Sequence, residues 1–262
     1  MADAKLSTVR NAARLLKTFL PHEEELGVAE LARRLGLGKS SVHRLLATLL
    51  DEGLLERDPR TGRYRLGIVM FELGEAVRVH MDLHAAAGAA LIALRERTGE
   101  SAQVAILDVP DVVYVDRVES PHTFRLYTDA GRRAPLHCTS SGKLLLAHRP
   151  DADQDAFLAT ARLEPVTRHT VIDAEQLRVE LATIRSRGWA ESVNERQIGL
   201  ASIAAPIRDL TGEVVAAISA GAPLSRFQAV ARKRLTQAVV DAGQTASRRL
   251  GWSPQVVYMR ES

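Results

Sequence analysis

Two segments with the apolar periodicity of an α-helix lie near the start of the chain, separated by a glycine-containing turn. The apolar face of the first consists of Val28, Leu31, Ala32 and Leu35. That of the second consists of Val42, Leu45, Leu46, Leu49 and Leu50. Gly36 can adopt the left-handed conformation that ends a helix, and Ser40 or Ser41 can accept a backbone N–H where the next helix begins. The pattern predicts a helix-turn-helix.

The second of these helices carries polar side chains that suit nucleic acid. Opposite its apolar face, near the N-terminus, lie Lys39, Ser40, Ser41, His43 and Arg44. Such side chains bond to phosphates and base edges, and the major groove of duplex DNA admits a helix. We therefore interpret it as a recognition helix. A helical hairpin with a merely solvated basic face is the alternative.

A β-hairpin is predicted immediately after this helix. Residues 54–57 and 63–66 have strand character, and the intervening Asp-Pro-Arg-Thr-Gly is rich in turn formers. Alternation places Tyr64 and Leu66 on one face and Arg63 and Arg65 on the other. A hairpin directly after a helix-turn-helix is a wing, with Arg60 and Arg63 as candidates for contacts to the DNA backbone. In the alternative interpretation, these arginines serve only solubility.

Two further helical regions flank the helix-turn-helix and wing. Residues 7–20 form a predicted first helix, whose inward-facing residues are Val9, Ala12, Ala13, Leu16, Phe19 and Leu20. The proline-free stretch 68–99 predicts a linker helix as far as Val79, a break, and a second helix over 83–97. We therefore expect three parts: a DNA-binding domain over residues 1–66, a linker helix over 67–83 and a second domain over 84–262.

The pattern changes after Glu100 to short strands interspersed with helices. Strands are predicted over 101–107, 112–118, 124–127, 189–193, 200–208 and 214–221, and 129–135 is predicted to be a loop. Helices are predicted over 141–148, 151–159, 174–187 and 227–250. Strands without regular βαβ alternation indicate an α+β domain with a mostly antiparallel sheet and helices packed on it.

Composition narrows the class of protein. The chain has 262 residues, of which 46% are hydrophobic and 26% charged, as expected of a soluble globular protein. No apolar run approaches the roughly 20 residues of a membrane span, and the N-terminus lacks the apolar core of a secretory signal. A single cysteine excludes an internal disulfide and is typical of a reducing cytoplasm. We expect a cytoplasmic protein with no membrane partner.

The basic charge is concentrated at the N-terminal end. Residues 1–66 hold 12 Lys and Arg against 9 Asp and Glu, and the rest of the chain holds 23 of each. The formal excess of +3 therefore lies entirely in the first quarter of the chain. This distribution indicates a nucleic-acid-binding head on a neutral body. Because only 4% of residues are aromatic, stacking on single-stranded bases is disfavoured and duplex DNA is the expected partner.

Over nearly its full length the chain resembles the IclR family of bacterial transcription regulators. The matching stretches are residues 38–46, the wing end 64–67, 99–101, 135–143, 187–189 and 199–207. The resemblance implies an N-terminal winged helix-turn-helix, a linker helix and a C-terminal GAF-like domain that binds a small-molecule effector. It also implies homodimers, often paired into a dimer of dimers, that bind double-stranded operator DNA and repress or activate transcription.

The expected effector site begins where residues 137–143 lead into an apolar helix. Ser140, Ser141 and Gly142 are small, and backbone N–H groups at a helix start favour an anion. The resemblance implies that this loop lines the pocket together with positions that match Ser192, Ser202 and Ser219. Well-studied acid-binding members have an acidic residue near the position of Ser192. The expected ligand is a small organic or aromatic carboxylate, although each serine alone is equally well explained as a structural hydroxyl.

Enzyme motifs are incomplete. Ser140 and Lys143 match a bare S-x-x-K without the companion motifs, and a phosphate loop is excluded because position 137 is His and position 144 is Leu. His137 and Cys138 are possible base and nucleophile, but neighbours on a strand point to opposite faces. The eight histidines show no metal-binding spacing. We predict no enzyme activity, no metal and no cofactor. A ligand-free architectural DNA binder and a pure protein-interaction module are the remaining alternatives.

Overall fold

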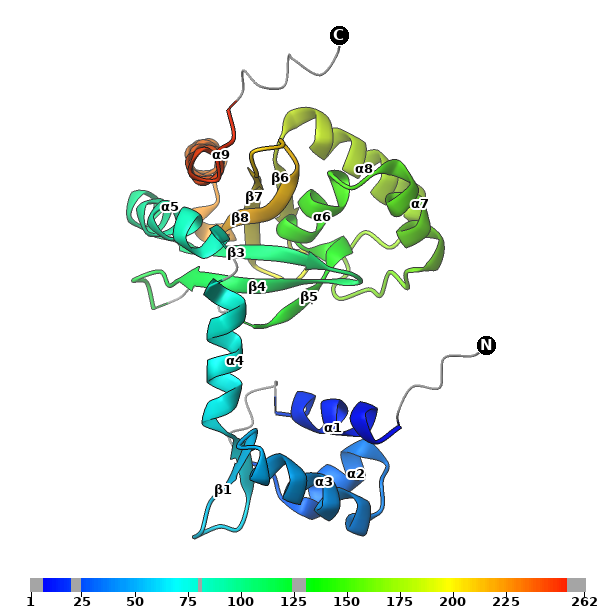
Figure 1. The fold of residues 1–262 in the computed structure, drawn as a ribbon. Helices are drawn as coiled ribbons and strands as arrows, with labels where there is room; N and C mark the ends of the chain where they lie inside the picture. Colours follow the sequence, from blue (N-terminus) through cyan, green and yellow to red (C-terminus); the bar gives the residue numbers. More distant parts are fainter. Residues whose placement is uncertain (1–6, 20–24, 80–81, 124–130, 254–262) are drawn as a thin grey trace. The chain divides into compact units, whose positions relative to one another are not determined.

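The computed structural model describes residues 7–19, 25–79, 82–123 and 131–253. Its contacts divide the chain into two compact units, Met1–Met81 and Asp82–Ser262, whose elements are labelled in Figure 1. Within the described residues, no helix is long and apolar enough to cross a membrane.

The N-terminal unit has a small helical core beside a two-stranded hairpin. Its elements are α1 (Ser7–Lys17), α2 (Val28–Leu35), α3 (Lys39–Asp51), β1 (Leu55–Arg57), β2 (Tyr64–Leu66) and α4 (Ile68–Val79). Apolar side chains from α1, α2, α3 and the hairpin form one cluster that includes Leu15, Leu31, Val42, Leu46 and Leu55. This arrangement confirms the predicted helix-turn-helix and hairpin.

The turn between α2 and α3 is partly as predicted. Gly36 ends α2 in the left-handed region with a φ of 66°, and its N–H bonds back to the last turn of the helix. The expectation that Ser40 or Ser41 caps α3 is wrong. Gly38 is the N-cap, no side chain caps the helix, and both serines lie within its first turn. Neither serine hydroxyl group is therefore engaged in capping the helix.

Helix α1 shows a different register from the predicted one. Leu15 is completely buried, whereas Val9 is 63% exposed and Ala13 is also exposed. Leu16 is only partly buried, and Leu20 lies outside the described residues. Because Leu15 and Leu16 are adjacent, periodicity alone did not determine which of them points into the core.

The C-terminal unit is built on one antiparallel sheet of six strands in the order β5-β4-β3-β8-β7-β6. The strands are β3 (Ser101–Asp108), β4 (Asp111–Val118), β5 (Arg133–Pro135), β6 (Ala190–Val193), β7 (Leu200–Arg208) and β8 (Val214–Pro223). The predicted α+β class is confirmed. Strand β5 was predicted as loop, and its proline, which lacks an N–H, is tolerated because β5 is an edge strand. The strand predicted over 124–127 lies outside the described residues.

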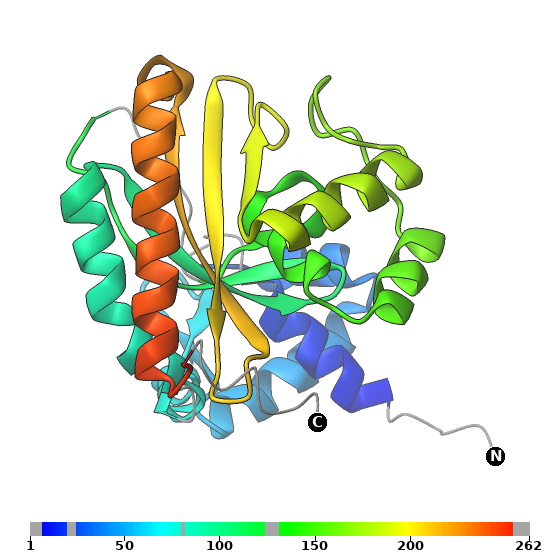
Figure 2. The same ribbon diagram turned by 90° about the horizontal axis from the view of Figure 1, so that it is seen from above.

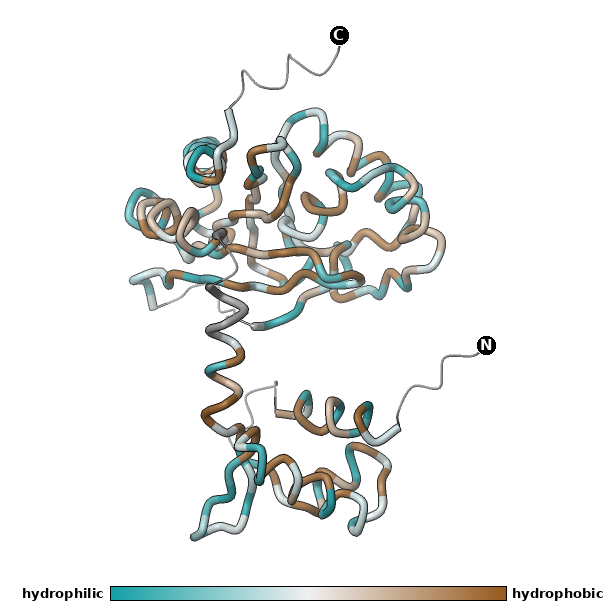
Figure 3. The backbone as a smooth tube through the Cα atoms, in the orientation of Figure 1, coloured by the Kyte–Doolittle hydropathy of each residue, from teal (hydrophilic) through white to brown (hydrophobic). Residues whose placement is uncertain are grey.

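Helices cover both faces of this sheet. On one face α5 (Asp82–Thr98) and α9 (Ala229–Arg249) lie side by side, as Figure 2 shows. On the other face lie α6 (Ser140–Ala147), α7 (Asp151–Thr160) and α8 (Ala174–Arg187). Figure 3 shows the central strands as mainly hydrophobic and the hairpin of the N-terminal unit as mainly hydrophilic. The sheet is thus buried on both faces, and the hairpin is mainly polar apart from the side chains, such as Leu55, that it adds to the core.

Helix α8 ends at a well-defined junction with β6. Asp173 caps its start, because its Oδ1 accepts the Gln176 backbone N–H at 2.7 Å. Gly188 ends it in the left-handed region with a φ of 79°. The Arg187 guanidinium then stacks over the Trp189 ring, 3.9 Å from its centre, just before β6 begins.

Helix α6 is buried along its whole length between the sheet and the outer helices. All eight of its residues, including polar ones, are buried. The helix approaches the preceding 3-10 turn, Leu136–Cys138, most closely at Gly142. A Cβ atom on Gly142 would lie 2.3 Å from the Leu136 carbonyl oxygen and 2.5 Å from its Cα atom. Only glycine fits at this position.

We expect Gly142→Ala to destabilise the protein by about 1–3 kcal/mol, because the added methyl group overlaps backbone atoms. Gly88→Ala is the matched control, since Gly88 lies inside α5 with nothing within 4 Å of an added Cβ. That replacement should raise stability by up to about 1 kcal/mol. Thermal unfolding measures both effects. Equal melting temperatures for the two variants would contradict the close approach at Gly142.

Candidate nucleic-acid interface and ligand pocket

The polar face of α3 is fully available to a partner. Lys39, Ser40, Ser41, His43 and Arg44 are all exposed. Within the described part of the chain, none of their side chains makes a hydrogen bond or ion pair. The opposite face of α3 is buried through Val42, Leu45, Leu46 and Leu49. The structure therefore places all five predicted contact residues of this helix on one exposed, basic surface.

The wing is a tight hairpin whose tip is held by Asp58. The Oδ1 atom of Asp58 accepts the backbone N–H of Arg60 at 2.6 Å and that of Thr61 at 3.1 Å. These hydrogen bonds lower the pKa of Asp58. Tyr64 is buried, and Arg63 and Arg65 are exposed, as the alternation predicted. The tip residue Arg60 is thereby presented on an ordered turn.

The four arginines of the wing differ in how far they are already paired. Arg65 bonds to Glu56 through two nitrogens, at 2.9 and 3.1 Å. Arg63 donates to the Glu25 carbonyl at 3.0 Å and lies 3.6 Å from the Glu30 carboxylate. Arg57 donates to the Gly62 carbonyl at 3.2 Å. The Arg60 side chain has no partner among the described residues. Of the two arginines predicted to contact the DNA backbone, Arg63 is partly paired within the protein and Arg60 is not.

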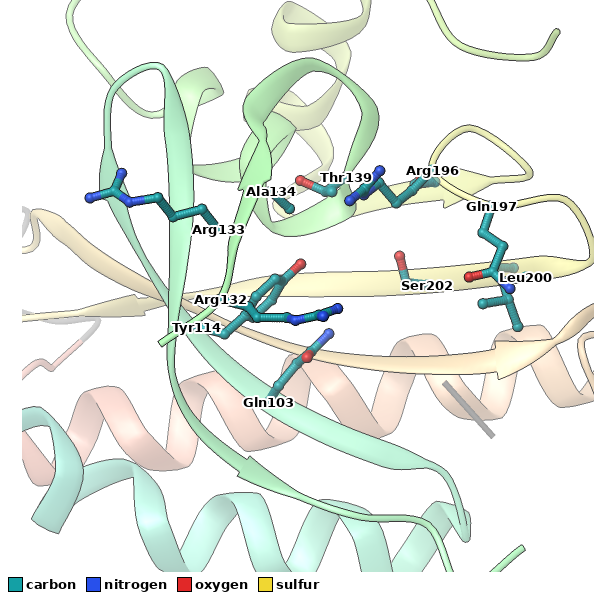
Figure 4. A pocket seen from close by; sticks show the side chains of 12 residues that line it. Gln103, Tyr114, Arg132, Arg133, Ala134, Thr139, Arg196, Gln197, Leu200 and Ser202 are labelled. Atoms are coloured by element: carbon teal, nitrogen blue, oxygen red, sulfur yellow. The ribbon is translucent and has the colours of Figure 1, made fainter. Parts of the chain in front are cut away.

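A pocket of about 240 Å³ opens at the end of the C-terminal sheet that lies near the start of α6. Strands β3, β4, β6 and β7, the β6–β7 loop and the residue before α6 supply its polar lining: Gln103, Tyr114, Thr139, Ser192, Gln197 and Ser202. Apolar contact comes from Ala134, Leu200 and Ala201. Figure 4 shows Gln103, Tyr114 and Ser202 reaching toward a common space. The pocket is lined mainly by hydrogen-bonding groups.

Three arginines also line this pocket, and their roles differ. Arg133 is paired with Asp108 and lies 3.9 Å from Asp111. Figure 4 shows its guanidinium pointing away from the other side chains. Arg132 and Arg196 point inward in the same view. The pocket lining contains no carboxylate. Its electrostatic character suits an anion.

The predicted effector residues divide into two groups in the structure. Ser192 and Ser202 line the pocket. Ser140 stands directly behind, with its hydroxyl 2.8 Å from that of Ser202. Ser141 and Ser219 are buried and do not line the pocket, and neither hydroxyl oxygen has a hydrogen-bond partner in the described part of the chain. Sequence reasoning thus identified one wall of the pocket and a polar layer beneath it.

The start of α6 is less open to an anion than expected. The Thr139 hydroxyl caps the helix by accepting the Gly142 N–H at 3.1 Å. Gly142 therefore serves close packing and does not offer a free N–H.

Burial raises the pKa of the Tyr114 hydroxyl to about 12, an effect partly offset by the nearby Ser141 hydroxyl and the Arg196 charge. Tyr114 thus remains a neutral O–H donor at physiological pH.

The buried Lys143 is the centre of an ion cluster. Its ammonium nitrogen lies 2.6 Å from Glu180 Oε1 and 2.7 Å from Glu195 Oε1, and the residue has no exposed surface. Burial raises the pKa of Glu195, and the Lys143 charge opposes that rise. Since Lys143 is held between two carboxylates, it is not available as the general base that an S-x-x-K motif requires.

The possible thiol site is equally unsuited to catalysis. Burial raises the pKa of Cys138 to about 11, so the thiol stays protonated. His137 Nε2 is 3.0 Å from the Glu164 carbonyl oxygen. His137 and Cys138 lie on a 3-10 turn rather than on the expected strand. Among the residues that the structure describes, no group of three His, Cys, Asp or Glu could hold a metal ion.

Of the residues that line the pocket, only Ser192 and Ser202 were predicted from the sequence; those that were missed include Gln103, Tyr114, Arg132 and Arg196. Arg132 stood in a stretch predicted as loop, and Arg196 lies four positions after Ser192, in a segment to which the sequence analysis assigned no role. Gln103 and Tyr114 were polar residues within predicted strands. The weak signal available was a polar residue in a strand whose other interior residues are apolar, as Gln103 is in Ser101–Asp108.

Comparison with known proteins agrees with this two-part architecture. The model of the IclR helix-turn-helix domain matches residues 8–59, and that of the bacterial transcriptional regulator IclR C-terminal domain matches residues 75–248. The regulator BhcR of Paracoccus denitrificans is 36% identical, over 88% of this chain and 82% of that protein. XynR of Escherichia coli is 31% identical, over 94% of this chain and 98% of that protein.

Solved structures show the same fold. An IclR homologue from Microbacterium hydrocarbonoxydans, complexed with 4-hydroxybenzoate, superposes with a TM-score of 0.84 at 29% identity, over 94% of this chain and all of that one. The Thermotoga maritima IclR gives a TM-score of 0.76 at 26% identity, over 94% and 99% of the two chains. With both domain models matched, the chain belongs to the IclR family of bacterial transcriptional regulators, which are DNA-binding proteins and not enzymes.

Proposed function

We propose that this regulator binds a near-palindromic operator and that a small organic or aromatic carboxylate in the C-terminal pocket controls its affinity for that operator. The observation that carries the proposal is the pocket itself, which is lined by arginines and hydroxyl groups without a carboxylate. Residues 1–66 then bind DNA, 67–83 act as linker and 84–262 bind the effector. The 4-hydroxybenzoate bound by the homologue from Microbacterium supports this ligand class.

Contacts to DNA are assigned to two elements of the N-terminal unit. Lys39, Ser40, Ser41, His43 and Arg44 reach base edges or phosphates from α3, and Arg60 and Arg63 contact the backbone from the wing. Their exposure supports this assignment. Because Arg63 is partly paired and Arg60 is not, Arg60 is the stronger candidate for a phosphate contact.

Among the residues assigned to the effector site, some contact the effector and others support them from behind. Ser192 and Ser202 bind it directly, and Ser140 orients the Ser202 hydroxyl. Ser141 and Ser219 carry buried hydroxyl oxygens without partners, which a ligand that reaches deeper would satisfy. Gly142 allows α6 to pack close enough to form this wall.

We propose further that the protein is a homodimer. On α4, Ile68, Phe71 and Leu73 are 62%, 64% and 52% exposed. Such apolar exposure on a helix is typical of a contact with a second copy. Two recognition helices then reach successive major grooves, and effector binding alters their spacing through the linker. Coupling of this kind is typically about 1–3 kcal/mol.

We expect the full-length protein to retain a few sharply enriched, palindrome-containing fragments from sheared host DNA, as measured by sequencing after pull-down at moderate salt. Arg44→Ala should lose this enrichment, because a lost base contact costs about 1–3 kcal/mol. Arg162→Ala is the charge-matched control, since that side chain is 90% exposed in the C-terminal unit. If all three proteins retain the same fragments, Arg44 does not contact the operator.

Arg60→Ala should weaken binding to every duplex and reduce the slope of log K against log salt by about 0.9, the value for one phosphate contact. Arg65→Ala removes the same charge from the same hairpin, but Arg65 is already bonded to Glu56. We expect a smaller change in slope for that variant. Binding titrations at several salt concentrations measure both. A slope unchanged in Arg60→Ala removes Arg60 from the phosphate contacts.

A bound small carboxylate at 100 times its Kd should stabilise the protein by about 2.7 kcal/mol, which is measured as a rise in melting temperature. Ser202→Leu removes a pocket hydroxyl and fills part of the pocket, so it should abolish the rise. Ser186→Leu on the exposed side of α8 is the matched control and should keep it. An undiminished rise in Ser202→Leu would locate the effector elsewhere.

A further inference from the structure

In strand β4, Tyr114 and Asp116 lie two positions apart but on opposite faces of the sheet, because the pairing with β3 contains a β-bulge. Val104 pairs with Asp116. The next residue, Ala105, pairs with Tyr114, so Val115 has no counterpart on β3. In regular pairing, residues two positions apart face the same side of a sheet. The bulge interrupts this alternation and re-aims the side chains beside it.

The two residues beside the bulge therefore contact different parts of the C-terminal unit. Tyr114 is buried on the face that α6 covers, and its side chain lines the pocket (Figure 4). Asp116 faces the other side of the sheet, where its Oδ2 lies 2.8 Å from the Nδ1 of His84 on α5. Its Oδ1 accepts the backbone N–H of Arg117 at 2.8 Å. One short segment of β4 thus touches both the pocket and α5.

Helix α5 is the helix that follows the linker helix in the sequence. Helix α4 ends at Val79 and α5 begins at Asp82, so His84 lies in the first turn of α5. The neighbouring Leu83 is buried, which packs this turn into the C-terminal unit. A displacement of Asp116 therefore acts on α5 at the end that is joined to the linker.

We propose that the contact between His84 and Asp116 transmits effector binding from the pocket to the linker helix. Because Tyr114 is buried among closely packed side chains, a ligand that displaces its ring also displaces the backbone of β4. The bulged segment yields first, since its ladder with β3 is already interrupted there. Asp116 then passes the shift to His84.

The inference rests on the proposed effector function of the pocket and assigns residues to its regulation. Neither His84 nor Asp116 lines the pocket, so both are positioning residues that do not touch the effector. Their removal should therefore leave effector binding intact and affect only the communication between effector and operator.

The test measures the factor by which a carboxylate changes the operator Kd of the full-length protein. An operator fragment from the pull-down described above is titrated with and without 4-hydroxybenzoate, benzoate, lactate and succinate, which represent aromatic and small aliphatic carboxylates. At least one of them should change the operator Kd of the wild type by about 5- to 150-fold, the usual range of coupling between two sites. His84→Ala and Asp116→Ala should each reduce this factor to about twofold or less, because the coupling free energy is lost.

Two further readouts separate this role from a merely structural one. Calorimetry should give a carboxylate Kd within about twofold of the wild type for both alanine variants, as expected when the altered residue does not share the site. Glu96→Ala is the matched control on the same helix, since Glu96 is exposed and has no partner among the described residues. That variant should keep the full factor. Thermal unfolding verifies that each variant folds.

An exchanged pair assigns the effect to the contact rather than to either side chain alone. His84→Asp combined with Asp116→His places the same two groups in exchanged positions. The double variant should recover a factor of about fivefold or more. A double variant that stays uncoupled contradicts the pairwise contact.

The remaining outcomes separate this inference from the function on which it rests. If either alanine variant keeps the wild-type factor, or if both lose affinity for the carboxylate itself, the relay is wrong and the effector pocket stands. If none of the four carboxylates binds the wild type or changes its operator affinity, the inference fails together with the proposed carboxylate effector.

Discussion

The burial of Lys143 is the constraint around which the C-terminal unit is arranged. Helix α6 lies between the sheet and the outer helices, and an ammonium group there is tolerated only if carboxylates accompany it. Glu180 from α8 and Glu195 from the β6–β7 loop supply them. The same three side chains therefore join the central helix, an outer helix and the loop that borders the pocket, so structural support and ligand site are one assembly.

The N-terminal unit follows the opposite principle, because its important polar side chains are left without partners. The apolar face of α3 packs in the core, and its basic face is exposed to solvent. In the wing, Glu56, Glu25 and Glu30 engage two of the arginines and the Gly62 carbonyl engages a third, which leaves Arg60 at the tip. The hairpin thus holds its shape through internal pairs while it presents one charge outward.

Local patterns predicted most helices and strands because periodicity, capping residues and glycine turns are encoded within a few neighbouring positions. They failed where the decision depends on distant contacts. Strand β5 exists only because β4 offers it an edge, and Leu15 rather than Leu16 is buried because α2 and α3 lie beside it. The serine wall of the pocket was predictable from family resemblance. Arg132 and Arg196 were not, since tertiary folding alone brings them together.

The stacking of Arg187 on Trp189 gives the molecule a built-in optical reporter. The chain has two tryptophans, at positions 189 and 252, and both belong to the C-terminal unit. Trp189 immediately precedes β6, the strand that carries Ser192 toward the pocket. Intrinsic tryptophan emission therefore monitors the ligand-binding unit without background from the DNA-binding head, and it does so in the unlabelled protein.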